Sequence, residues 1–138
     1  MAIYGQEFSS ISTGNHANVL EVSDLIRTTD VQNGRWDKLL TEWLSAHLDS
    51  SGQRALILLN HPAISNSPSA LEYGRDDFST FEAWRTALDN RAQLINILNG
   101  PSHDEGTGLP LPDPSESEFL RYLNLGFHLA PTADQDNQ

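Results

Sequence analysis

The 138-residue chain contains no cysteine and only one lysine, Lys38. Without cysteine it can form no disulfide, no cysteine-based zinc finger and no thiol nucleophile. A single lysine argues against a lysine-based mechanism. No apolar run approaches the roughly 20 residues that cross a bilayer, and no basic segment followed by an apolar one opens the sequence. We therefore expect neither a membrane span nor a signal peptide within this chain, and the composition leaves its compartment open.

Basic residues are scarce as well. Eight Lys and Arg stand against nineteen Asp and Glu, which gives a formal net charge of −11. Such a surface repels phosphate backbones, so nucleic acid and anionic membranes are not expected partners. A phosphorylated small molecule is still compatible with this charge, because a local metal cluster can reverse the field at one site. The length suits one domain, 1–138, with a hydrophobic core.

The hydrophobic pattern alternates between strand-like and helix-like segments. Segment 92–100 could extend the preceding helix by periodicity, but its length and its terminal Asn99-Gly100 favour a strand. Ser79 or Thr80 is placed to cap the helix before it. Strands are predicted over 1–12, 17–22, 55–60, 92–100 and 127–138, and helices over 35–48, 81–88 and 115–126. This order predicts an α/β fold with mostly parallel strands, open or barrel-like.

The segment "ALILLN", residues 55–60, is a short apolar run. Apolar residues at nearly every position are typical of a strand that is covered on both faces. The stretch stops abruptly at Asn60-His61-Pro62, where a parallel α/β fold places its ligand site.

Histidines and carboxylates recur at the predicted strand ends. Mixed imidazole and carboxylate sets suit zinc, manganese or iron. The residues at or near these ends are Glu7, His16, His61, Asn99, His103 and Asp136. Each also has an ordinary interpretation: a solvated acid, a surface histidine in a turn, or a histidine bonded to a backbone carbonyl. His47 is expected near the surface, and His128 is expected to pack within the last strand.

The order of four motifs resembles the PHP (polymerase and histidinol phosphatase) superfamily, in its carbaryl-hydrolase-like branch. The motifs are "GQEFSSISTGNHANVL", "LILLNHP", "INILNG" and "FLRYLNLGFHLAPTADQDN". The resemblance covers nearly the whole chain. It implies a partial (β/α) barrel of PHP type and a metal-dependent hydrolase that acts on a phosphate ester or related small-molecule substrate.

The resemblance also implies roles for individual residues. Glu7 matches a glutamate that bridges two metals, His16 and His61 match metal-binding histidines, and Asp136 matches the aspartate of a closing Asp-x-His motif. A divalent cation such as zinc, manganese or iron is therefore the implied cofactor. His103, after Asn99-Gly100, is the candidate proton donor to the leaving group.

Two departures from the family pattern predict an incomplete site. The first family motif, a His-x-His, is expected ahead of Met1, and the closing histidine is replaced by Gln138. We therefore expect a fragment with a partial metal site, little turnover and an exposed sheet edge that could pair with a second copy. The alternatives are a non-catalytic, degenerate or regulatory α/β module, and an α/β binding protein that never bound metal. Arg75 and Arg91 could clamp a phosphate or could be solvated.

Overall fold

The computed structural model describes residues 5–10, 16–22, 24–48, 55–60, 73–99 and 115–134. In this part of the chain five strands form one sheet, in the order β1-β2-β3-β4-β5. The strands are β1 (Gly5–Ser9), β2 (His16–Leu20), β3 (Leu56–Leu59), β4 (Ala92–Asn99) and β5 (Ala130–Asp134). The helical segments are η1 (Lys38–Trp43), α1 (Leu44–Leu48), η3 (Arg75–Asp77), α2 (Phe81–Asp89) and α3 (Ser115–Asn124). The predicted α/β class is confirmed.

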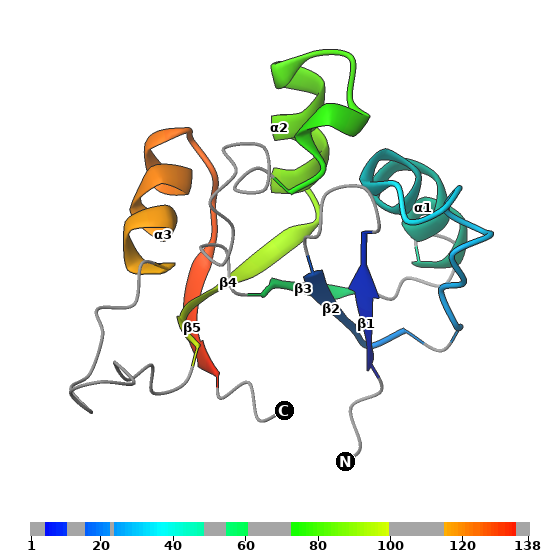
Figure 1. Cartoon of the computed structure of the whole chain (residues 1–138), viewed down its shortest axis with the longest axis horizontal. Helices are drawn as coiled ribbons and strands as arrows, with labels where there is room; N and C mark the ends of the chain where they lie inside the picture. Colours follow the sequence, from blue (N-terminus) through cyan, green and yellow to red (C-terminus); the bar gives the residue numbers. More distant parts are fainter. Residues whose placement is uncertain are drawn as a thin grey trace, which may run out of the picture.

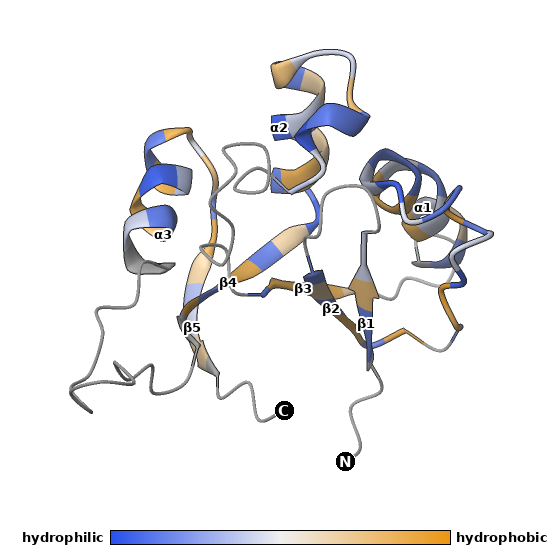
Figure 2. Cartoon of the chain, in the orientation of Figure 1, coloured by the Kyte–Doolittle hydropathy of each residue, from blue (hydrophilic) through white to orange (hydrophobic). Residues whose placement is uncertain are grey.

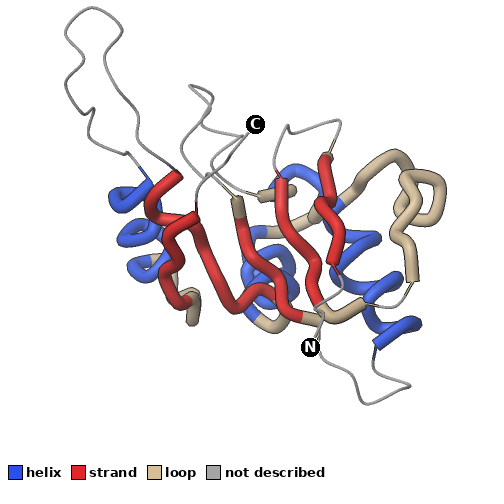
Figure 3. The backbone as a smooth tube through the Cα atoms, turned by 90° about the horizontal axis from the view of Figure 1, so that it is seen from below, coloured by secondary structure: helices blue, strands red, loops and turns tan. Residues whose placement is uncertain are grey.

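The helices lie on one side of the sheet (Figure 1), and the view from below in Figure 3 shows the strands in front of them. No helix among the described residues is long and apolar enough to cross a membrane. In Figure 2 strand β3 is coloured as hydrophobic, whereas much of α1, α2 and α3 is hydrophilic. The fold is thus a two-layer arrangement in which apolar helix faces cover one face of a sheet.

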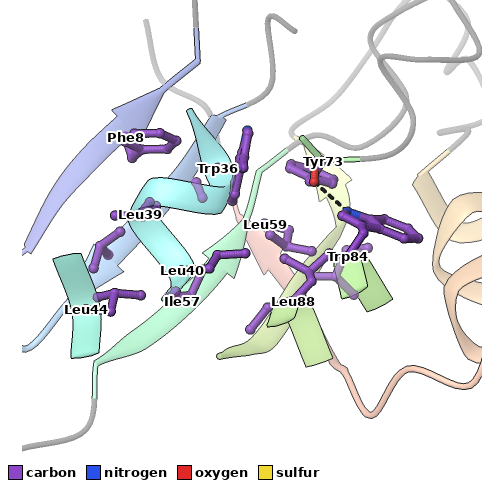
Figure 4. Packing of buried hydrophobic residues seen from close by; sticks show 14 of the residues in the cluster. Phe8, Trp36, Leu39, Leu40, Leu44, Ile57, Leu59, Tyr73, Trp84 and Leu88 are labelled. Atoms are coloured by element: carbon purple, nitrogen blue, oxygen red, sulfur yellow. Dashed lines mark hydrogen bonds between the residues drawn. The ribbon is translucent and has the colours of Figure 1, made fainter. Parts of the chain in front are cut away.

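One core joins this sheet face to the helices (Figure 4). Strand residues alternate between faces, so Phe8 of β1, alternate residues of β2 and alternate residues of β3 enter it. Its fully or nearly fully buried members include Phe8, Ala17, Val19, Trp36, Leu39, Leu40, Leu44, Ile57, Leu59, Trp84, Leu88, Ile95 and Tyr122. Leu58, which alternates with Ile57 and Leu59, is only 6% exposed yet lies outside this cluster. Burial on both faces of β3 is therefore confirmed.

The expectation of mostly parallel strands is wrong for the first half of the sheet. β1 pairs with β2, and β2 with β3, in antiparallel fashion, while β3–β4 and β4–β5 are parallel. Only residues 10–15 connect β1 to β2, and a parallel crossover needs a dozen residues or more. The helix after β2 does not make a crossover either, because Leu56 at the start of β3 pairs with Leu20 at the end of β2. The sheet is mixed.

From β3 onward, strands and helices alternate along the chain as predicted. Thr80 caps α2, since its hydroxyl accepts a hydrogen bond of 3.1 Å from the Ala83 backbone N–H. Segment 92–99 is strand β4 rather than a continuation of α2. The helices α2 and α3 are the crossovers that make β3, β4 and β5 parallel.

A network of hydrogen bonds and an ion pair joins the residues that precede η1 to η3. Arg35 donates two hydrogen bonds to the carboxylate of Asp37, at 2.8 and 2.9 Å, and a third of 3.0 Å to the backbone carbonyl of Asp77. The Asp77 carboxylate in turn accepts a 2.7 Å bond from the Trp36 N–H. This network holds the segment that begins at Tyr73 and Gly74 close to Trp36.

Candidate functional site

The β1–β2 hairpin brings two of the predicted metal ligands together. Glu7 lies opposite Asn18, and Ser9 lies opposite His16, so all four occupy one face of the sheet. Phe8 points to the other face and into the core. The result is a 2.7 Å contact between Oε1 of Glu7 and Nδ1 of His16.

Both side chains of this pair are accessible. The exposed fraction is 50% for Glu7 and 36% for His16. Carboxylate oxygen and imidazole nitrogen are both ligands of zinc, manganese and iron. A cation that replaced the proton shared by the two groups would be bound by both, so the chemistry of the donor set fits such a metal. The pair supplies two ligands.

The pair lies at the end of the sheet where the parallel strands finish. The backbone carbonyl of His16 accepts a 3.0 Å hydrogen bond from the N–H of Asn60, which directly follows β3. The last pair of β4 and β5 is Asn99 with Asp134, and both strands run parallel to β3. The start of β2 and the carboxyl ends of β3, β4 and β5 therefore share one end of the sheet, as ligand sites in open α/β sheets do.

The other predicted site residues fall outside the described residues. They are His61, which follows Asn60 in sequence, His103, four positions after Asn99, and Asp136, two positions after Asp134. Within the described ranges no three His, Cys, Asp or Glu side chains gather closely enough to hold a metal ion. The described part of the chain thus contributes the Glu7–His16 pair.

Sequence reasoning overlooked Tyr73. Its backbone and side chain are buried, and its phenol donates a hydrogen bond to the carbonyl of Asn60 at the end of β3. Burial holds the pKa of the Tyr73 phenol well above 10.0, and the nearby Tyr122 and Glu118 raise it further. The group therefore stays protonated, as a donor must. No local pattern could reveal this bond, because its partners are 13 residues apart.

Trp36 lies on the apolar face of the predicted helix 35–48, but its position beside the candidate site was not predicted. Its side chain is fully buried and makes edge contacts with Phe8, at 5.1 Å between ring centroids, and with Tyr73, at 5.5 Å. The indole N–H of Trp36 has no hydrogen-bond partner among the described residues. Trp36 therefore lies between the residue next to Glu7 and the residue that bonds Asn60.

The other two histidines of the described ranges, His47 and His128, lie away from the pair. His47 is exposed, as expected, and its ring stacks on Trp43 at 4.1 Å. The expectation that His128 packs within the last strand is wrong, because it precedes β5 and its side chain is 87% exposed. Its imidazole Nδ1 pairs with the carboxylate of Asp89 at 2.9 Å, and its backbone N–H also binds Asp89. Asp89 closes α2, so this pair joins the helix layer to the approach of β5.

The two arginines considered as phosphate clamps occupy different places. Arg91 directly precedes β4, at the opposite end of the sheet from Asn99, and donates a 2.9 Å bond to Ser45. With Ser45 and Thr86, Arg91 lines an open groove of about 810 Å³ that lies between α2 and the helical segments η1 and α1. Arg75, the first residue of η3, donates a 3.3 Å hydrogen bond to the carbonyl of Phe78, which directly follows η3. Arg91 is therefore remote from the strand ends that carry the Glu7–His16 pair.

Comparisons with protein-family models, with curated proteins and with solved structures found no match to this chain.

Proposed function

We propose that this chain carries part of a PHP-type metallohydrolase site, in which Glu7 and His16 bind a divalent cation. The observation that carries the proposal is the 2.7 Å contact between Oε1 of Glu7 and Nδ1 of His16. Two strands contribute these groups, and the motif resemblance assigns metal binding to both. Their position at the carboxyl ends of β3, β4 and β5 supports the proposal.

In the proposed reaction the residues of the chain bind and orient the reactants. A bound cation would supply activated water and would neutralise charge on a phosphate ester or a related small substrate. Glu7 and His16 hold their ligand atoms at the open face of the hairpin, where substrate has access. His61 and Asp136 are the proposed further ligands, and His103 is the proposed proton donor to the leaving group.

The proposed ligands Glu7, His16, His61 and Asp136 lack the closing histidine of the family motif, where this sequence has Gln138. Removing one member of a set that acts together usually costs orders of magnitude in rate. We therefore expect cation binding with little turnover of a generic diester, bis(p-nitrophenyl) phosphate. The proposal includes a partial PHP-type barrel, with β1 as an edge strand that could pair with a second copy.

The direct test is a titration of the purified chain with Mn²⁺ and Zn²⁺ by calorimetry, together with elemental analysis. We expect about tenfold or greater weakening of binding in Glu7→Gln and in His16→Ala, because each removes a ligand. His128→Ala is the matched control, since it breaks another imidazole–carboxylate pair, with Asp89. It should bind as wild type does.

Three results would contradict the proposal. The first is a wild-type chain that binds no cation, which would favour the non-catalytic α/β module. The second is unchanged binding in both Glu7→Gln and His16→Ala. The third is ready hydrolysis of the diester without added metal.

A further inference from the structure

Tyr73 is held in place by two helices. The carbonyl of Tyr73 accepts a 2.7 Å hydrogen bond from the indole N–H of Trp84 in α2, and the Tyr73 N–H donates a 3.3 Å bond to the phenol oxygen of Tyr122 in α3. Figure 4 shows Tyr73 beside Trp84, with a dashed line for the bond between them. The next residue, Gly74, packs against Trp36. Both backbone polar groups of Tyr73 are thus bonded to side chains of the helix layer.

From this position Tyr73 reaches the end of β3. Its hydroxyl donates to the carbonyl of Asn60, and the N–H of Asn60 donates to the carbonyl of His16 at 3.0 Å. Both backbone groups of Asn60 are thereby engaged, one by the helix layer and one by β2. The imidazole of His16 then meets the carboxylate of Glu7. Two hydrogen bonds through the Asn60 backbone thus connect Tyr73 to the backbone of His16, whose side chain contacts Glu7.

We propose that Tyr73 is a positioning residue, which holds the end of β3 against His16 and so sets the geometry of the Glu7–His16 pair for a cation. The metal part of this inference rests on the proposed function. Groups that orient metal ligands through hydrogen bonds typically change affinity by 10–100-fold when they are removed. The side chain of Tyr73 touches neither Glu7 nor His16 in these hydrogen bonds, so its effect passes through Asn60.

The test compares two conservative variants of the same aromatic core. Tyr73→Phe removes the hydroxyl that binds Asn60 and leaves the ring. Tyr122→Phe removes the hydroxyl that accepts from the Tyr73 N–H and leaves the Asn60 bond in place. A loss of stability alone would affect both variants. We expect roughly tenfold weaker Mn²⁺ binding by calorimetry in Tyr73→Phe, and binding within twofold of wild type in Tyr122→Phe.

A second measurement needs no metal. The ¹⁵N chemical shifts of the His16 ring, recorded by two-bond ¹H–¹⁵N NMR on metal-free protein, report its contact with Glu7. We expect these shifts to change in Tyr73→Phe and to stay at wild-type values in Tyr122→Phe. Unchanged His16 shifts in Tyr73→Phe overturn the inference, as do equal changes in both variants. A wild-type chain that binds no Mn²⁺ overturns the proposed function, and the NMR comparison then decides the positioning role separately.

Discussion

Glu7 and His16 are nine positions apart in the chain, yet their side chains touch diagonally across the β1–β2 hairpin. The register pairs Ser9 with His16, and Glu7 lies two residues before Ser9 in β1, on the same face. Diagonal neighbours at this spacing are within reach of long side chains. A shift of register by one residue would move the ligands to opposite faces.

Without metal, the Glu7–His16 pair should add little to stability. Both side chains are substantially exposed, and exposed ion pairs contribute about 0–1 kcal/mol. We therefore expect Glu7→Gln and His16→Ala to change the free energy of unfolding by less than about 1 kcal/mol in chelator. Added Mn²⁺ should raise the melting temperature of wild type and of His128→Ala, because a ligand of the native state stabilises it. The same rise in Glu7→Gln or His16→Ala would contradict the assignment.

Gly74 should be far less replaceable than Gly126, although both have positive φ angles of 63° and 86°. A Cβ at Gly74 would lie 2.1 Å from the Cβ of Trp36, whereas among the described residues one at Gly126 would meet only Arg85 Nη1, at 3.8 Å. Gly126→Ala should cost about 1 kcal/mol through backbone strain. Gly74→Ala should cost at least about 2 kcal/mol more, since the overlap must also be relieved. Urea unfolding measures both, and equal costs would contradict the packing.

Asp37 should make stability depend on acid pH. Burial alone raises the pKa of its carboxyl, but the hydrogen bonds and charge of Arg35 outweigh this and leave the pKa below 3.8. A carboxyl with a lowered folded pKa stabilises the native state above its unfolded pKa, and this stabilisation is lost as pH falls through the folded value. Asp37→Asn should therefore cost about 1 kcal/mol at pH 7, a value discounted for the exposure of Arg35.

The difference between Asp37→Asn and wild type should shrink below pH 3.8, as measured by urea unfolding across that range. Glu82→Gln is the control, because it removes an exposed carboxylate paired with Arg85. It should leave unfolding unchanged. A cost of Asp37→Asn that is constant from pH 7 to pH 2 would rule out the ion pair as its cause.

Tyr73 should have the opposite effect at alkaline pH. Its phenol pKa is raised well above 10.0 in the folded chain, first by burial. Above pH 10 the unfolded chain releases this proton more readily than the native chain, so stability falls as pH rises. Tyr73→Phe should cost about 1–3 kcal/mol at pH 7, because the Asn60 carbonyl loses its donor. The variant should then lose less stability than wild type between pH 9 and 11, and parallel curves would contradict this.

Local chemistry was sufficient for much of the second half of the fold. Thr80 begins α2 because its hydroxyl replaces a missing backbone acceptor, and this preference is readable from the residue type. Segment 92–99 is a strand, in line with the length of the predicted segment 92–100 and its terminal Asn99-Gly100. The direction of β1 relative to β2 could have been derived from the short connection 10–15. The alternation of strands and helices predicted parallel strands instead, and for β1 and β2 that prediction is wrong.

For the candidate site as well, some features could be predicted from the sequence and others depend on tertiary packing. Residue types at the predicted strand ends, together with the motif resemblance, selected Glu7 and His16 and indicated imidazole–carboxylate chemistry. Their contact depends on the antiparallel β1–β2 hairpin, which was not predicted. The contacts of Tyr73 with Asn60, of Trp36 with Phe8, and of Arg35 with Asp77 exist only once distant segments pack together. Such contacts are set by burial and by the geometry of the whole core, and hydrophobic periodicity carries no information about which distant residue a buried polar group will meet.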